Sequence, residues 1–345
     1  METVWFLLLT GALGAYVVLD GFDLGVGMLS VLVAKTDAEK RQLYRSVGPV
    51  WDGNEVWLLA SGGTMFLAFP KLLATGLSGF YLPIMLVLWL LLLRALSIEL
   101  RHQLHDSMWT ALWDALFFAS SLLLVVVFGA ALGNVLRGVS YGPDGHFFAP
   151  LWTTFLPIAP VGALDWFTVT IALESVVVLA LHSALWLEWR TDEQVERRAA
   201  ALADRLFWLA LVGAGVATAL SLYVQPRLLA GLAQRPWVFA CVLPVGALLL
   251  VPILRKRGRK GAAFVASALH IGGLLLAAAL SLYPWMLPGT EAGSGLTVQT
   301  AKAADYSLMV GLCWWLPALG LVLFCQRYVY RQLPAKFSLE DDVAH

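Results

Sequence analysis

The stretch LDGFDLGVG, residues 19–27, places Asp20 and Asp23 inside an apolar run that extends from about residue 4 to residue 33. A helix over this run would be longer than the hydrocarbon core of a bilayer, which is about 30 Å thick. The two acids are three residues apart and share one helix face. Burying an Asp at the centre of a lone spanning helix costs roughly 2.5–3.5 kcal/mol, so both acids need partners and are candidates for a functional role.

The composition of the whole chain is typical of a membrane protein. Of its 345 residues, 60% are hydrophobic and 13% are charged, against about 25% charged residues in an average soluble domain. This excludes a water-soluble globule, and we expect residues 1–345 to form a single polytopic membrane domain. The 23 basic and 23 acidic residues cancel, so the net charge gives no indication of a nucleic-acid partner.

Hydropathy along the chain predicts nine membrane-spanning helices. The fold class is therefore an all-α integral membrane protein, which we expect to form two four-helix bundles plus one peripheral helix. The expected spans lie near residues 4–33, 50–70, 72–98, 109–135, 165–189, 205–225, 237–254, 262–283 and 306–328.

Lysines and arginines are distributed unevenly over the loops between these spans. Alternate loops carry 18 of these residues on one side and five on the other. By the positive-inside rule the first side is cytoplasmic, which puts the N-terminus outside and the C-terminus inside. Two loops, 136–164 and 284–305, fall on the outer side and are rich in Gly and Pro, so we expect them to form ordered caps over the bundle.

Charged residues from the first three spans are expected at one depth near the cytoplasmic side. Asp20 and Asp23 lie toward the inner end of the first span, and the second span begins with Asp52 and Glu55 in VWDGNEVWL (50–58). The third span runs inward and ends with three further charged residues, Arg94, Glu99 and Arg101.

This cluster has two compatible interpretations. In the first, Arg94 neutralises Asp20, Asp23 or Asp52 in a structural ion-pair network where three helices pack closely through glycines. The glycines are Gly21, Gly25, Gly27, Gly53, Gly62 and Gly63. In the second, carboxylates in a hydrated cleft form a path that takes up protons from the cytoplasm.

Three residues in the later spans are weaker candidates. Glu174 lies near the middle of the fifth span, and we expect it to hydrogen-bond a neighbouring helix rather than to join a path. His182 and His270 could serve one haem at most, because a haem needs axial ligands that face each other. We therefore expect both to be satisfied core histidines. No cysteine has metal-ligand spacing, and we predict no metal site.

The segments that carry these acids resemble one known family. The matching motifs are DGFDLGVGML (20–29), VWDGNEVWLLASGG (50–63), SGFYLPIMLVLWLLLLRALSIELR (78–101) and WDALFFASSLLLVVVFGAALGNVLRGV (113–139), with looser matches at YPWMLP (283–288), LTV (296–298), Tyr328 and Tyr330. They resemble subunit II of the cytochrome bd quinol oxidases, and the resemblance covers the whole length of the chain.

The resemblance implies a heterodimer in the bacterial inner membrane. Subunit I of such a complex carries two b-type haems, one d-type haem and the quinol site, whereas subunit II carries no haem and often holds a structural quinone or lipid. The complex oxidises quinol and reduces dioxygen to water with cytoplasmic protons. This chain would then hold no catalytic centre, and its partners would be subunit I, membrane lipids and, in some complexes, a small single-helix subunit.

The resemblance also implies roles for individual residues. Family members have a hydrophilic path through subunit II, and its acids and arginine match Asp23, Asp52 and Arg94, with Asp20 beside them. Glu55 stands where many members have Gln. We assign the proton path to Asp20, Asp23, Asp52, Glu55 and Arg94, and we treat as structural polar residues Glu99, Arg101, Glu174 and His182.

Two other functions compete with this assignment. A proton-coupled secondary transporter also uses paired intramembrane acids and glycine-broken helices. A transporter acts alone, however, and this chain lacks a mid-membrane cluster of polar residues that would bind a substrate. A stand-alone haem b protein is disfavoured by the histidine count.

Overall fold

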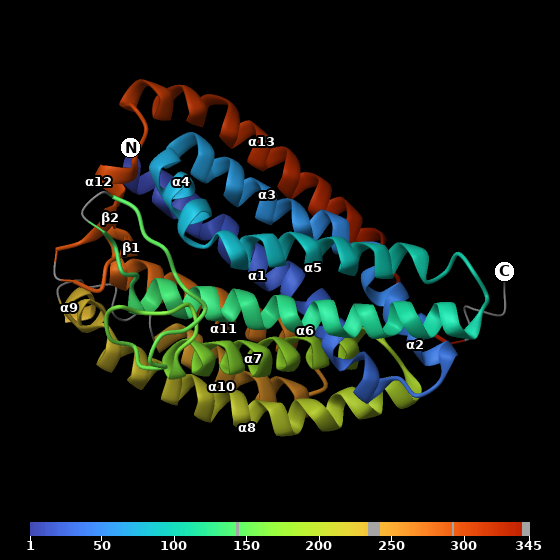
Figure 1. Cartoon of the computed structure of the whole chain (residues 1–345). Coiled ribbons are helices and arrows are strands. Elements are labelled where there is room, and N and C mark those ends of the chain that lie inside the picture. The colour runs from blue at the N-terminus through green and yellow to red at the C-terminus, as the bar shows by residue number, and fades with distance from the viewer. Residues whose placement is uncertain (143–144, 234–241, 292, 340–345) are drawn as a thin grey trace.

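Helices form almost the whole of the computed structural model, which describes residues 1–142, 145–233, 242–291 and 293–339 (Figure 1). The helices are α1 (Glu2–Val33), α2 (Asp37–Val47), α3 (Trp51–Ala68), α4 (Pro70–Gly79), α5 (Tyr81–Leu100), α6 (Ser107–Arg137), α7 (Trp166–Arg190), α8 (Glu193–Val224), α9 (Pro226–Ala233), α10 (Val242–Lys256), α11 (Lys260–Leu282), α12 (Val298–Ala301) and α13 (Asp305–Gln332). Two short strands, β1 (Trp285–Pro288) and β2 (Gly295–Thr297), complete the secondary structure of the described residues.

Seven of the described helices are long and apolar enough to cross a membrane: α1, α5, α6, α7, α8, α11 and α13. The pair α3 and α4, bent by 118°, counts as an eighth crossing if both helices belong to one span. The structure confirms an all-α membrane protein, but it does not confirm the expected count of nine. For the span expected at 237–254, α10 has 15 residues, and residues 237–241 lie outside the described part of the chain.

The third expected span, 72–98, is interrupted. Residues 70–79 form the separate helix α4, and α5 begins only at Tyr81. Pro70 occupies the first position of α4, where its missing N–H removes no intrahelical hydrogen bond. A proline ring disfavours helical backbone at the residue before it. Phe69 accordingly has non-helical angles, φ −134° and ψ 58°, and the chain turns there.

The long helices fall into two groups with one helix at the edge. The helices α1, α3, α5 and α6 form the first group, and α7, α8, α10 and α11 form the second. Figure 1 shows α13 lying along α3 at one edge of the molecule and α8 at the opposite edge. The N-terminus and the C-terminal end of α13 lie at opposite ends of the bundle. The two groups are not separate bundles, because α6 packs extensively on α7, and α1 packs on both α7 and α11.

Helix α1 joins the two groups through close contacts at glycines. A Cβ atom at Gly25 would lie 1.8 Å from Ser183 Oγ of α7, and one at Gly27 would lie 2.2 Å from Ser121 Oγ of α6. Only glycine permits these approaches. The expectation that the glycines join the first three spans was wrong, because α1 meets α6 and α7 here, and no atom lies within 4 Å of a Cβ built at Gly62 or Gly63.

The described parts of the loops 136–164 and 284–305 lie at the same end of the bundle and contact each other. Strands β1 and β2 pair as an antiparallel hairpin, and Val139 from the first loop forms a bridge with Gly289 from the second. The Val139 N–H donates to the Pro288 carbonyl at 3.0 Å, and Leu287 and Leu296 are buried beneath the hairpin. The described parts of these loops therefore cover one end of the bundle, as expected of caps, and they contain a hairpin that was not predicted.

Candidate functional site

The centre of the site is an ion pair between α1 and α5. Arg94 Nη1 donates to Asp20 Oδ2 at 2.7 Å, and Arg94 Nη2 lies 2.6 Å from Asp20 Oδ1. Both side chains are completely buried. Two opposite charges in such a place stabilise each other, whereas either one alone would be an uncompensated buried charge. The sequence analysis expected this pairing, and the structure contains it.

Asp23 lies one helical turn from Asp20 and has a different partner. Its Oδ2 accepts a hydrogen bond from Asn54 Nδ2 at 2.7 Å, and its Oδ1 has no hydrogen-bond partner among the described residues. The side chain is completely buried. Asp23 thus brings a second buried carboxyl beside the Asp20–Arg94 pair, held by a neutral amide instead of a cation.

Asn54 connects this carboxyl to helix α13. Its Oδ1 accepts hydrogen bonds from Gln326 Nε2 at 2.7 Å and from the Tyr330 hydroxyl at 2.9 Å. Its amide also donates to the Leu19 carbonyl at 3.1 Å. The sequence analysis missed the roles of Asn54 and Gln326, and it noted Tyr330 only as part of a motif. A buried neutral amide between two acids, in DGNE (52–55), was the available signal for Asn54.

Glu55 and Asp52 extend the line of acids to the surface of this chain. Glu55 Oε1 lies 3.4 Å from Arg94 Nη1, and its side chain is 23% exposed. Asp52, one turn earlier on α3, is exposed and forms no ion pair within the described residues. The carboxyls of α1 and α3 thus differ in burial: Asp52 is exposed, Glu55 is half-buried, and Asp20 and Asp23 are completely buried.

Two charged residues expected near this cluster lie elsewhere. Glu99 is exposed on α5. Arg101 belongs to a second network, in which its Nε donates to Asp114 Oδ1 at 2.6 Å and its Nη2 donates to Asp37 Oδ1 at 2.7 Å. Lys40 also pairs with Asp114 at 2.9 Å. This second network joins α2, the end of α5 and the start of α6.

The charge of Arg101 changes the titration of Asp37, which lies in the short helix outside the spans. Partial burial acts to raise the pKa of Asp37, but the hydrogen bond from Arg101, its charge and the charges of Arg41 and Lys40 outweigh burial and hold this pKa below its usual value. Asp37 is therefore ionised over the whole neutral range.

Among the described residues, Glu174 has no hydrogen bond to a neighbouring helix, which differs from our expectation. Its side chain is half-buried between α7 and α8, where the missing side chain of Gly213 leaves room, since a Cβ there would lie 1.8 Å from Glu174 Oε2. Glu174 Oε1 has no hydrogen-bond partner among the described residues. No charged residue of the central cluster contacts it, so the structure leaves it outside the site.

His182 is a satisfied core histidine, as expected. Its Nε2 donates to the Val18 carbonyl at 3.1 Å, its Nδ1 is hydrogen-bonded to Ser267 Oγ at 2.6 Å, and its ring stacks on Phe264. His270 is only half satisfied, because Nδ1 donates to the Pro244 carbonyl at 2.8 Å while Nε2 has no partner among the described residues. Within the described residues, no group of three His, Cys, Asp or Glu side chains could hold a metal ion.

Comparisons of family profile, sequence and fold all find subunits or chains of cytochrome oxidases. The profile of the family described as cytochrome bd terminal oxidase subunit II matches residues 1–333. A probable cytochrome oxidase subunit 2 of Haemophilus influenzae is 32% identical over 318 residues, covering 84% of this chain and 82% of the relative. The cytochrome bd-I ubiquinol oxidase subunit 2 of Escherichia coli is 29% identical over 369 residues, covering 99% of this chain and 96% of the relative.

A solved structure shares the fold. A chain of the bd oxidase from Geobacillus thermodenitrificans superposes with a TM-score of 0.77, covering 96% of this chain and 97% of that chain at 18% sequence identity. At this identity the likeness concerns the fold alone, and it supports the arrangement of helices described above.

Proposed function

The chain belongs to the family of cytochrome bd terminal oxidase subunit II, and from this premise we propose that it serves as the scaffold for subunit I and as the path by which cytoplasmic protons reach that subunit. As a member of this family it is a multi-pass membrane subunit of a bd-type quinol oxidase. Subunit II pairs with subunit I, and the complex contains haem.

We assign the haems of the complex to subunit I. Haem ligation in proteins of this type needs axial side chains that face each other across the iron. In this chain both ring nitrogens of His182 are hydrogen-bonded to protein, and the Nδ1 of His270 is bonded to a carbonyl. His182 therefore has no free ring nitrogen for an iron. His270 could offer its Nε2, which has no partner among the described residues, but His182 cannot supply a second axial nitrogen, so we place no haem in this chain.

The graded burial of four carboxyls carries the proton-path proposal. Asp52 is open to the surface, Glu55 is half-buried beside Arg94, and Asp20 and Asp23 are completely buried. Arg94 compensates the charge of Asp20, so Asp23 is the completely buried carboxyl that can gain or lose a proton without breaking an ion pair. Acids in such positions within a membrane are typical of proton relays.

The orientation of the chain supports uptake from the cytoplasm. Figure 1 shows the start of α3 at the bundle end that also carries α2, the turn between α10 and α11, and the end of α13. Asp52 and Glu55 belong to the first turns of α3, and Asp23 is hydrogen-bonded to Asn54 beside them. The most basic loops of the sequence belong to this end. We therefore place this end in the cytoplasm and the β1–β2 hairpin outside.

One face of α3 fits the docking of subunit I. Asp52, Leu59, Gly63 and Phe66 are all exposed and, at spacings of seven, four and three residues, share one side of the helix. An exposed acid facing lipid would be unfavourable, whereas a partner subunit can compensate it. The open glycines of this face allow another helix to approach closely.

We expect Asp23→Asn or Asp52→Asn to slow oxygen reduction without removing haem from the complex, because a carboxamide cannot relay a proton. Loss of a proton-transferring group commonly costs about 100-fold in rate, and Asp23→Asn should show the larger loss. Quinol-driven oxygen consumption and the reduced-minus-oxidised spectrum measure the two quantities. The matched control is Glu99→Gln, which removes an exposed acid at the same end outside the network.

Wild-type turnover of both aspartate variants with normal haem content would disprove the proton path. The scaffold role has its own test, in which Gly62→Leu and Gly63→Leu should reduce the yield of the complex by blocking close helix approach. Gly215→Leu is the matched control, because Gly215 on α8 is equally open, with no atom within 4 Å of a Cβ built there. Equal complex yields from the α3 and α8 variants would argue against docking at α3.

A further inference from the structure

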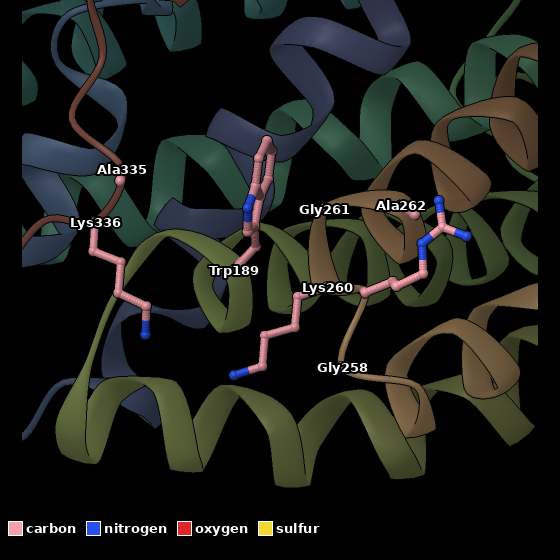
Figure 2. Close-up of a pocket in the computed structure, with 8 residues that line it drawn as sticks. Trp189, Gly258, Lys260, Gly261, Ala262, Ala335 and Lys336 are labelled. Carbon is pink, nitrogen blue, oxygen red and sulfur yellow. The ribbon is translucent and has the colours of Figure 1, made fainter.

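A hollow of about 630 Å³ lies at the bundle end assigned to the cytoplasm, away from the proton path. It is lined by Trp189 from the end of α7, by residues 258–262 around the turn into α11, and by Ala335 and Lys336 after α13 (Figure 2). Its volume is within the range of sites that bind small molecules, about 300–1,000 Å³.

One wall of this hollow is apolar. The indole of Trp189 lies against Gly261 so closely that a Cβ there would be 2.9 Å from the ring. Ala262 and Ala335 add small side chains beside it. Tryptophan at the end of a spanning helix commonly marks the level of the lipid headgroups.

The rim of the hollow is basic. Lys260 and Lys336 both pair with Glu196 of α8, Lys336 at 2.6 Å, and Figure 2 shows both side chains extending toward that helix. Arg259 is exposed, and its side chain forms no hydrogen bond or ion pair within the described residues. Lys256 and Arg257, at the end of α10, are exposed as well. Three cations therefore line the hollow, and Glu196 pairs with two of them, Lys260 and Lys336.

We propose that this hollow binds the headgroup of an anionic phospholipid from the membrane leaflet at this end of the bundle. The phosphate would lie among Arg259, Lys260 and Lys336, and the glycerol region would lie against Trp189. Basic pockets between helix ends on the cytoplasmic side are sites where anionic lipids bind. The positive-inside rule explains the charge of this loop, but it does not require a hollow with an aromatic, apolar wall.

A lipid is favoured over a soluble anion because of the position of the hollow. Trp189 lies at the end of α7, a candidate spanning helix, so we expect the hollow to lie near the level of the lipid headgroups, where their local concentration is high. The apolar wall would bring no benefit to a free phosphate ion, whereas it can cover the first carbons of a lipid. The proposal requires only membrane insertion and is independent of the proton path.

The test uses the purified complex, washed free of loosely bound lipid in detergent. Phosphatidylglycerol with a photoactivatable headgroup is titrated, and its cross-links are mapped to the peptides that carry Trp189 and residues 258–262. We expect Arg259→Gln combined with Lys336→Gln to weaken labelling about 30-fold, since each cation contributes on the order of 1 kcal/mol. These changes leave the Lys260–Glu196 pair in place.

Two further variants separate shape from charge. Lys35→Gln combined with Arg205→Gln removes the same charge from exposed positions outside the hollow and should leave labelling unchanged. Ala335→Trp keeps every charge but fills the hollow from an exposed position, and it should abolish the labelling of the Trp189 peptide. Normal oxidase activity and haem content in all variants would show that the complex is intact.

Four results would overturn the proposal. The first is unchanged labelling in the Arg259→Gln, Lys336→Gln variant, and the second is equal labelling by phosphatidylcholine. The third is complete displacement by inorganic phosphate, which would identify a free anion as the occupant. The fourth is labelling that appears only after residues 340–345 are deleted, because this acidic segment would then be the occupant.

Discussion

Arg94 on α5 and Arg101, the residue that caps the C-terminal end of this helix, lie about two turns apart in contrasting surroundings. Arg94 and its partner Asp20 are completely buried, whereas Arg101 is buried but pairs with Asp37, which is 54% exposed, and with Asp114, which is 14% exposed. Water can solvate the partners of Arg101 if it is lost, but it cannot reach Asp20. The difference shows that two arginines close together in the sequence can have different roles. Arg94 neutralises a buried carboxylate, whereas Arg101 joins the ends of neighbouring helices.

The largest effect is expected from Arg94→Leu. This change leaves Asp20 as an uncompensated buried charge, at a cost of about 3–5 kcal/mol, so the yield of assembled complex should fall strongly. Haem content per milligram of purified membrane and the thermal unfolding temperature of the solubilised complex measure it. A normal yield would show that Arg94 is not a structural counter-charge.

The double variant Arg94→Leu, Asp20→Leu sharpens this test. Replacing a buried pair by apolar residues is often neutral or stabilising, so assembly should recover. Oxygen reduction should recover with assembly if the pair is only structural, and it should stay slow if the pair belongs to the proton path. The two interpretations of the cluster therefore give different results in one variant.

A smaller effect is expected from Arg101→Leu. Its hydrogen bonds to two carboxylates are worth about 2 kcal/mol, but Lys40 remains beside Asp114 and water reaches Asp37. The unfolding temperature should fall moderately, and oxygen reduction by the remaining complex should stay normal. An effect as large as that of Arg94→Leu would contradict the distinction between the two networks.

The smallest effect concerns pH. Because the pKa of Asp37 is lowered in the folded chain, its contribution to stability is present above its unfolded pKa, about 3.9, and is lost as the pH falls through the lower folded value. For a half-exposed pair this is at most about 1 kcal/mol. Unfolding temperatures of wild type and Asp37→Asn should differ slightly at pH 6 and converge below pH 4, and a difference that grows with acidity would contradict this sign.

Much of the site could be predicted because helix geometry is regular. With a fixed rise per residue, Asp20 on an inward-running helix and Arg94 near the inner end of another reach the same depth, and the cost of burial requires them to pair. The same regularity did not reveal Asn54, Gln326 or Tyr330. Neutral polar side chains are tolerated in many environments, so only their positions show that they hold Asp23.

The sequence by itself determined the membrane class, the approximate spans, the family and the group of acids near one end. These follow from local hydropathy, from the burial cost of charge and from specific motifs, which need no knowledge of helix neighbours. The tertiary structure decided which helices meet. It placed the glycines of α1 against α6 and α7, and it gave Arg101 other partners than Arg94, because long-range packing depends on side-chain shapes from distant segments.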